Sequence, residues 1–473
     1  MDKYERFKES IGIAVEKFKE LDKRNPIRLV SHLDADGISA CSILIKMLNS
    51  NNRKYSISIV QHLNQDVLKE LSKESYKYFI FADLGSGQLK GIKEHLGNKT
   101  IFIFDHHKPE ETKVKSNIIH VNPHLFGIDG GKEVSGAGVS FLFARQLNKK
   151  IEDMAHVAVI GAMGDMQSEK DGFLRLNKGI LDMAVKNKKI KVIKGLRIFG
   201  AQTKPLHKVL EYSTDPYIPG VSGSESGAIQ FLNQVGVDPK LDNGWKKVVH
   251  LTEEELKKLV AGIIMQRLGE EDPEDVLGDV YILNDEKKES ALRDAKEFAT
   301  LLNACGRLGK SSLGIGACLG DKKTKERAIQ NLNGYKKEIV NAMKWYEKNK
   351  ESEDVIVDDK YIIINAKDRI MPTMIGTVAS IISKSNGIKE GTFIMSLAYL
   401  IDGTMKASLR LGGYKKKDID LREVIKSITD KVGGEAGGHK MAAGAIVPME
   451  KEKEFIDKAK EVLGKKAIEE VVG

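Results

Sequence analysis

The segment Ile101–Glu110, IFIFDHHKPE, decides the fold. Four consecutive β-prone apolar residues precede Asp105, His106 and His107. An uninterrupted apolar run of this length is typical of a strand buried in a parallel sheet. Ligands of open α/β sheets bind beyond the carboxyl ends of the strands. The segment therefore puts a carboxylate and two imidazoles where such a fold holds its chemistry.

The same pattern, an apolar run followed by an acid, occurs at two earlier places. Ile27–Val30 leads into SHLDADG, and Tyr78–Ala82 leads into DLGSG. A predicted helix over 154–162, rich in small residues, leads into a further acid. The carboxylates collected in this way are those of Asp34, Asp36, Asp83, Asp105 and Asp165.

These acids predict a site for divalent cations. Carboxylates that face one crevice repel one another, and most would have to take up protons. Mixed oxygen and imidazole ligands suit Mn²⁺, Mg²⁺ or Zn²⁺, and the lack of nearby thiols argues against a structural zinc site. The ligands suffice for two cations, which at about 3.5–4 Å apart activate a water and hold both oxygens of an in-line phosphoryl displacement.

Two local alternatives stay open. Taken alone, the DxDG pattern at Asp34 and Asp36 is also common in turns, and His32 could ligate a metal or support a ligand. The loop GIDGGKEVSGAG, which precedes a predicted helix over 139–147, could offer N–H groups to a phosphate or serve only as a connection.

The segments SHLDADG, FADLGSG, FDHH and GAMGD resemble, in order and spacing, the four motifs of the DHH phosphoesterase superfamily. Residues 433–444, GGEAGGHKMAAG, resemble the GGGHxxAAG signature of the companion DHHA1 domain, with Ala436 departing from the strict pattern. The resemblance covers residues 1–190 and 355–473. Within the superfamily, the length and the middle of the chain are most similar to the archaeal RecJ-like single-strand nucleases.

The resemblance implies an α/β fold with three domains and a connecting helix. We expect a DHH catalytic domain over 1–190, with a mainly parallel sheet and helices on both faces. A helical insertion over 191–325 and an inter-domain linker helix over 326–354 follow. An α/β DHHA1 substrate-binding domain with a mixed sheet occupies 355–473. In that domain, Asp402-Gly403 between two apolar runs predicts a hairpin, and the glycine run 433–438 predicts a loop.

The resemblance also implies the roles of individual side chains. Asp83 would bridge two metals, whose ligands are His32, Asp34, Asp36, Asp83, His106 and Asp165. Asp105 and His107 are the catalytic candidates: His107 would contact the scissile phosphate or the leaving oxygen, and Asp105 would ligate a metal or orient an imidazole. Arg307 lies in LNACGR, which resembles the NAxGR segment of RecJ, and could instead form a surface ion pair. The expected substrate-binding residues are Arg307, Arg369, Ser408, Arg410, Gly437, Gly438 and His439.

Composition adds little to this. A net charge of +9, from 76 basic and 67 acidic residues, fits a polyanionic substrate and equally a solvated lysine-rich surface. Cys41, Cys305 and Cys318 form no CxxC pattern, which favours a reducing cytosol. The charged N-terminus and the absence of an apolar run of roughly 18 residues predict a cytoplasmic protein without a membrane segment.

By resemblance, the function is that of a metal-dependent exonuclease that hydrolyses single-stranded DNA, 5′→3′, with RNA as a second substrate. Two divalent cations would serve it, Mn²⁺ first and Mg²⁺ second, and the GINS complex of the replication fork is the expected partner. Two alternatives remain: an oligoribonucleotide or cyclic-dinucleotide phosphodiesterase, and a replisome scaffold bound to GINS. The residues themselves fix neither the polarity of cleavage nor the sugar.

Overall fold

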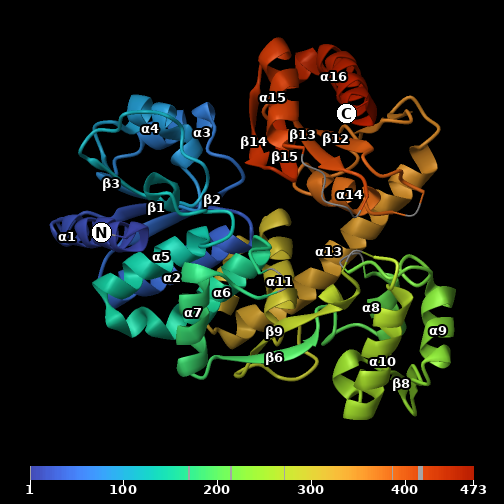
Figure 1. Ribbon diagram of the computed structural model, residues 1–473. Helices are drawn as coiled ribbons and strands as arrows, with labels where there is room; N and C mark the ends of the chain where they lie inside the picture. Colours follow the sequence, from blue (N-terminus) through green and yellow to red (C-terminus); the bar gives the residue numbers. More distant parts are fainter. Residues whose placement is uncertain are drawn as a thin grey trace. The chain divides into compact units, whose positions relative to one another are not determined.

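A computed structural model of the 473-residue chain describes residues 2–168, 171–213, 216–270, 272–385, 387–413 and 419–472 (Figure 1). The chain divides into two compact units: Met1–Glu211 with Glu225–Leu332, and Tyr212–Ser224 with Asn333–Gly473. No helix in the described ranges is long and apolar enough to cross a bilayer.

The first unit is built around a five-stranded sheet. Its strands are β1 (Ile27–His32), β2 (Tyr55–Val60), β3 (Tyr78–Ala82), β4 (Thr100–Phe104) and β5 (Ile118–Val121). Their spatial order is β2-β1-β3-β4-β5, and every pair is parallel, as predicted. The chain moves outward from β1 to β2 and then returns to β3 on the other side of β1. The order therefore reverses between β1 and β3, and such a switch point opens a crevice at the carboxyl ends of the strands.

Helices cover both faces of this sheet (Figure 1). They are α1 (Lys3–Lys19) and α5 (Gly136–Leu147) on one face, and α3 (Gln65–Lys73) and α4 (Leu89–Leu96) on the other. Phe102 of β4 packs against Phe18 of α1 and Phe143 of α5, with ring centroids 5.8 and 6.4 Å away. Its neighbour Ile103 points the other way, into the cluster that contains Leu68 of α3. Because both faces are buried, the strands read as continuous apolar runs rather than as alternating ones.

The rest of the first unit is mainly helical, as predicted. It contains α2 (Ala35–Ser50), α6 (Ala155–Gly164), α7 (Arg175–Lys186), α8 (Leu206–Glu211), α9 (Glu225–Gln234), α10 (Glu253–Gln266), α11 (Ala295–Arg307) and α12 (Ser311–Cys318). The sequence did not predict the antiparallel pair β6 (Ile190–Leu196) and β9 (Leu277–Leu283), whose strands are far apart along the chain. Helices α2, α5, α6 and α11 pack against one another beside the sheet.

The second unit contains a six-stranded mixed sheet in the order β10-β11-β12-β13-β15-β14. The strands are β10 (Val355–Val357), β11 (Tyr361–Asn365), β12 (Phe393–Tyr399), β13 (Thr404–Leu411), β14 (Glu435–His439) and β15 (Ala442–Pro448). The accompanying helices are α13 (Lys322–Asn349), which begins in the first unit, α14 (Ile375–Ile382), α15 (Leu421–Val432) and α16 (Glu452–Val472). β11 and β12 are parallel and the remaining pairs are antiparallel. The predicted hairpin joins β12 to β13, with Gly403 at φ +79°.

The prediction of a loop over 433–438 is wrong. Most of this glycine run forms β14, the edge strand that pairs with β15. Gly438 has φ +121°, and a Cβ there would lie 2.5 Å from the carbonyl oxygen of Ala442. Gly438 therefore permits a close backbone approach that a larger residue would prevent.

Candidate metal centre

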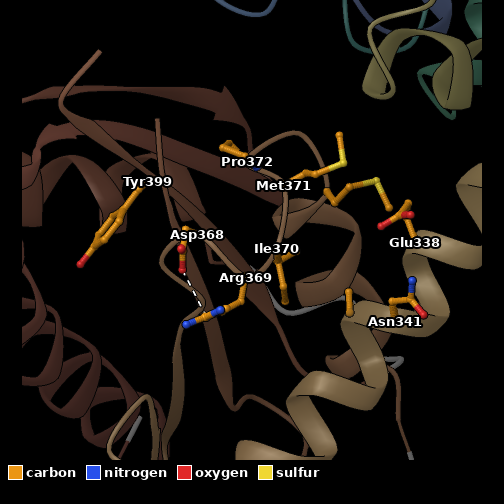
Figure 2. Close-up of a pocket in the computed structure, with 10 residues that line it drawn as sticks. Glu338, Asn341, Asp368, Arg369, Ile370, Met371, Pro372 and Tyr399 are labelled. Atoms are coloured by element: carbon orange, nitrogen blue, oxygen red, sulfur yellow. Dashed lines mark ion pairs between the residues drawn. The ribbon is translucent and has the colours of Figure 1, made fainter. Parts of the chain in front are cut away.

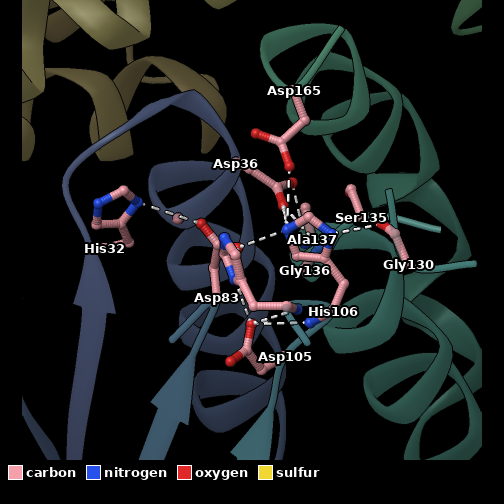
Figure 3. A network of polar contacts seen from close by, with 12 residues as sticks. His32, Asp36, Asp83, Asp105, His106, Gly130, Ser135, Gly136, Ala137 and Asp165 are labelled. Atoms are coloured by element: carbon pink, nitrogen blue, oxygen red, sulfur yellow. Dashed lines mark hydrogen bonds and ion pairs between the residues drawn. The ribbon is translucent and has the colours of Figure 1, made fainter. Parts of the chain in front are cut away.

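The acidic residues predicted from the strand ends lie together at one edge of the first sheet (Figure 3). β1, β3 and β4 are neighbouring parallel strands, so their carboxyl ends reach the same edge. Asp34 caps α2 directly after β1, Asp83 follows β3, and Asp105 follows β4. Asp165 arrives from a different element, because it is the C-terminal cap of α6.

His106 lies at the middle of one group of possible ligands. Its Nε2 atom is 3.0 Å from Asp165 Oδ2, 3.3 Å from Asp83 Oδ1 and 3.7 Å from Asp36 Oδ2. One ligand atom each from Asp36, His106 and Asp165 lies within 4.8 Å of the others, the spacing of a metal-binding group.

A second group forms around His32. Its Nδ1 atom is 2.9 Å from Asp34 Oδ2 and 3.6 Å from Asp83 Oδ2. Asp83 thus turns Oδ2 toward His32 and Oδ1 toward His106, between the two groups. The geometry brings all six predicted metal ligands together.

Asp83 provides the test of whether a cation fits. Its side chain is only 1% exposed, yet neither carboxylate oxygen accepts a hydrogen bond from any residue that the structure describes. Its backbone has φ +58°, a conformation that is strained for a residue with a side chain. The imidazoles of His32 and His106 lie 3.6 and 3.3 Å from its oxygens, so protonated rings compensate its charge in the chain alone, and a divalent cation would do so in their place. The donor set, oxygens and imidazoles without thiols, fits divalent cations such as Mn²⁺ or Mg²⁺.

The pKa values of two residues in the centre also agree with binding of a cation. Burial, followed by the charge of Asp83, raises the pKa of Asp36 well above its usual range. Burial alone would lower the pKa of His106, but Asp165 and Asp83 outweigh it and raise that pKa well above the ordinary value. In the absence of cations, Asp36 and His106 therefore hold protons, which a bound cation would replace.

The N-terminus of α5 holds Asp36. The backbone N–H groups of Gly136 and Ala137 donate to its two oxygens, at 2.6 and 3.0 Å. These are amides of the glycine-rich loop that the sequence offered to a phosphate, and they bind a protein carboxylate instead. A Cβ at Gly136 would lie 2.5 Å from Asp83 Oδ1, so glycine is needed for this approach.

The orientation of His106 depends on residues that the sequence did not reveal. Its Nδ1 lies 2.6 Å from the Gly130 carbonyl oxygen, an acceptor, so Nδ1 carries the proton and Nε2 faces the carboxylates. The same carbonyl accepts from Gln167 Nε2 at 2.9 Å, and Gln167 Oε1 accepts from Asn177 Nδ2 at 2.7 Å. Gln167 and Asn177 are both 2% exposed. The sequence alone does not show that these two amides are buried beside His106.

Asp105 uses its oxygens to hold backbone and ring donors. Oδ1 accepts from His107 Nδ1 at 2.7 Å and from the His106 N–H at 2.8 Å, and Oδ2 accepts from the Ser86 N–H at 2.8 Å. Burial would raise the pKa of Asp105, but His107 and these donors outweigh it and lower that pKa below its usual range. Asp105 also forms a group with Asp83, His106 and His107 whose possible ligand atoms lie within 4.8 Å of one another, so its position suits both roles left open by the sequence, metal ligation and orientation of His107.

Asn122 and Ser86 complete this support. Asn122 Nδ2 lies 2.8 Å from both Ser86 Oγ and the His107 carbonyl oxygen. Ser86 Oγ is also 2.8 Å from His120 Nε2. The backbone of His107 is therefore tied to the turn after β3.

The predicted substrate-binding residues divide between the two units. Arg307 is half-buried at the end of α11 in the first unit. In the second unit, Ser408 and Arg410 lie on β13 beside Gly376 of α14, where a Cβ would lie 3.4 Å from Ser408 Oγ and 3.1 Å from Arg410 Nη2. Arg410 Nε donates to Ser380 of the same helix at 2.8 Å. Ser408 and Arg410 are thus brought together.

The remaining predicted residues lie elsewhere in the second unit. Arg369 is exposed, 3.3 Å from Asp368, and both line a cavity of about 300 Å³ together with Asn341 of α13 (Figure 2). Gly437 and Gly438 are exposed on β14, separated from β13 by β15. For His439 the described part is its backbone, which is paired with Ala442 in the register of the two strands.

Known families and structures match this architecture. Residues 26–163 match the DHH family, N-terminal domain; residues 198–279 match the DHH-CID domain; residues 358–465 match the DHHA1 domain. An uncharacterized protein of Methanocaldococcus jannaschii is 33% identical over 454 residues, which is 95% of each chain. The chain therefore belongs to the DHH/DHHA1 superfamily of phosphoesterases.

Within this superfamily the fold is RecJ-like. RecJ of Thermus thermophilus in complex with Mn²⁺ superposes with a TM-score of 0.58 at 18% identity, covering 97% of this chain and 55% of RecJ. The chain thus spans about half the length of that protein. CDC45 of Entamoeba histolytica superposes with a TM-score of 0.62 at 13% identity, covering 98% of this chain and 99% of CDC45.

Proposed function

We propose that the protein is a two-metal phosphodiesterase that degrades single-stranded DNA from the 5′ end, with RNA as a second substrate, in DNA replication and repair. The observation that carries the proposal is Asp83. It is buried, accepts no hydrogen bond from the described residues, and turns one oxygen toward each of two ligand groups. Such a carboxylate suits the bridge between two cations.

In this proposal each group holds one cation. His32 and Asp34 form one group and Asp36, His106 and Asp165 the other, with Asp83 shared. Bound cations would supply a water of lowered pKa and polarise a phosphoryl oxygen. Mn²⁺ is our first choice and Mg²⁺ the second, and RecJ of T. thermophilus has been solved with each of these ions.

His107 acts on the substrate itself in this scheme. Burial would lower its pKa, but Asp105 outweighs burial and raises it. A protonated His107, held at Nδ1 by Asp105, can donate from Nε2 to a phosphate oxygen or to the leaving oxygen.

The substrate strand would be gripped mainly by its backbone. The proposed contacts are Arg307, Arg369, Ser408, Arg410, Gly437, Gly438 and His439. Arginine binds phosphates through two donors, whereas base stacking needs aromatic side chains, which are only 6% of this chain. We also propose the domain division 1–190, 191–325, 326–354 and 355–473.

The test is a time course on single strands labelled at the 5′ or the 3′ end, with Mn²⁺, Mg²⁺ or EDTA. We expect the label at the 5′ end to be released first, as mononucleotides, and only when metal is present. A dinucleotide offered in parallel tests the oligoribonucleotide alternative: faster turnover of the dinucleotide than of a long strand would contradict the exonuclease proposal.

A second candidate is a replisome scaffold that binds GINS, and the similarity in fold to CDC45 favours it. The two roles are compatible in one protein. Retention of GINS by the Asp83→Ala variant in a pull-down would establish scaffolding that is independent of hydrolysis. An absence of GINS binding by the wild type would exclude it.

A further inference from the structure

Helix α11 reaches the loop that carries the first acidic motif. Asn303 Oδ1 accepts a hydrogen bond from the Ala35 N–H at 2.9 Å, across 268 residues of sequence. Ala35 is the first residue of α2, so its N–H has no acceptor within that helix. A side chain from the other end of the first unit supplies the acceptor.

The same helix approaches the loop with its backbone. A Cβ at Gly306 would lie 1.7 Å from the Leu33 carbonyl oxygen, so only glycine fits there. From another direction, a Cβ at Gly164 of α6 would lie 2.6 Å from Ala35 Cβ. Residues 33–35 are thus confined between α11 and the end of α6 by contacts that leave no room for side chains.

These contacts bear on the spacing of the two ligand groups. The confined loop directly follows His32 and carries Asp34, while Gly164 directly precedes Asp165. Asp34 Oδ1 accepts from the Gly37 N–H, so the direction of its Oδ2 follows the loop backbone. A shift of the loop would move one group relative to the other.

We propose that Asn303 and Gly306 are positioning residues, through which α11 fixes the His32–Asp34 loop and sets the affinity of the centre for divalent cations. The proposal rests on the metal site of the proposed function. It assigns a role to a helix that lies outside the segments 26–163, 198–279 and 358–465 matched by the domain families.

The experiment compares full-length variants by two readouts that do not involve hydrolysis. Mn²⁺ affinity is measured from free Mn²⁺ by electron paramagnetic resonance, and loop order from amide exchange at Ala35 in metal-free protein. Asn303→Ala should weaken Mn²⁺ binding about 10-fold, the lower end of the loss seen when outer-sphere partners of metal ligands are removed. Exchange at Ala35 should become faster.

Two further variants serve as rescue and control. Asn303→Asp keeps an acceptor at the same reach and should restore both readouts. Asn333→Ala, an exposed asparagine of α13, should leave both unchanged. If Asn303→Ala does not fold, Asn303→Ser, whose hydroxyl is too short to reach Ala35, replaces it.

Unchanged Mn²⁺ affinity in a folded Asn303→Ala or Asn303→Ser protein would overturn the inference. An Asn303→Asp protein that binds Mn²⁺ as weakly as Asn303→Ala would overturn it as well. Failure of the proposed function looks different. A wild type that binds Mn²⁺ but cleaves no strand would refute the nuclease proposal and leave the Mn²⁺ comparison intact.

Discussion

Asp83 carries several features that each lower the stability of the folded protein. It combines a left-handed backbone, nearly complete burial and a carboxylate that takes no hydrogen bond from the described chain. Each of these features is unfavourable for stability. Together they are explained by cations that bind to the site after folding. The residue is therefore the sharpest place to test the site.

We predict that Asp83→Asn folds but loses the stabilisation that Mn²⁺ confers on the wild type. The amide keeps the shape and removes the charge that two cations would share. Thermal melts with Mn²⁺ and with EDTA measure the effect, and hydrolysis should fall by more than about 100-fold, since changes to outer partners alone cost about 10–100-fold.

The matched control is Asp182→Asn, an exposed carboxylate on α7 that pairs with Lys178. It should melt and hydrolyse like the wild type. An Asp83→Asn protein that still gains the wild-type rise in melting temperature from Mn²⁺ would show that Asp83 binds no metal.

The hydrogen bonds that hold the backbone of His107 give a second prediction. Asn122→Ala removes the hydrogen bond to the His107 carbonyl and the one to Ser86, while every predicted metal ligand remains. We expect kcat to fall about 10-fold or more, with Mn²⁺ affinity close to that of the wild type because every predicted metal ligand remains. Steady-state kinetics and Mn²⁺ titration separate these effects, and an equal loss of both would instead indicate general damage to the site.

At the scale of elements, the N-terminus of α5 lies directly against the candidate metal centre. Gly136→Ala would place a methyl group 2.5 Å from Asp83 Oδ1, so it should displace that side chain and abolish metal-dependent hydrolysis. Gly179→Ala on α7 is the control, because nothing lies within 4 Å of a Cβ there. It should leave activity unchanged and stabilise α7 by about 0.5–1 kcal/mol. Full activity in Gly136→Ala would contradict this placement of α5.

The elements also show what sequence reasoning could and could not reach. Apolar runs that end in Asp34, Asp83 and Asp105 predicted the site, because parallel strands bring their carboxyl ends to one edge. The hydrogen bond between Asn303 and Ala35 joins residues that are 268 positions apart, and it produces no periodic pattern in the sequence. The strand β14 was missed for another reason: its glycines are typical of a loop, whereas Gly438 allows the strand to approach the backbone of β15 closely.

At the scale of the whole molecule, one buried carboxyl couples folding to pH. Burial, aided by the charge of Asp294, raises the pKa of Glu297 to about 7, against hydrogen bonds from Gln202 and Thr203. The folded chain therefore binds this proton more tightly than the unfolded chain. Its contribution is complete at low pH and is lost as the pH rises from about 4.5 through 7.

We predict that the wild type loses stability between pH 5.5 and pH 8 and that Glu297→Gln loses less, by an amount on the order of 2 kcal/mol. The amide imitates the protonated acid and does not titrate. Urea unfolding at the two pH values measures the difference. Glu289→Gln is the control, since the pKa of exposed Glu289 is lowered to about 2 and lies outside this interval. Parallel pH profiles for Glu297→Gln and the wild type would show that Glu297 does not titrate there.

The second unit has a hydrophobic core of its own, formed by residues of the mixed sheet with α15 and α16. Residues 355–473 contribute every member of that cluster, from Ile363 to Leu463. We therefore predict that a fragment 355–473 folds alone and unfolds cooperatively in urea. It should bind single-stranded DNA weakly and hydrolyse none, with or without Mn²⁺, because the acidic centre lies entirely in the first unit.

Arg410→Ala in this fragment removes the guanidinium beside Ser408. It should weaken DNA binding and make that binding less dependent on salt, because the salt dependence of affinity grows with the number of phosphates that the protein neutralises. Titration of a labelled single strand at two salt concentrations measures both effects. A folded fragment whose DNA affinity is unaffected by Arg410→Ala would remove the case for β13 as a substrate-binding strand.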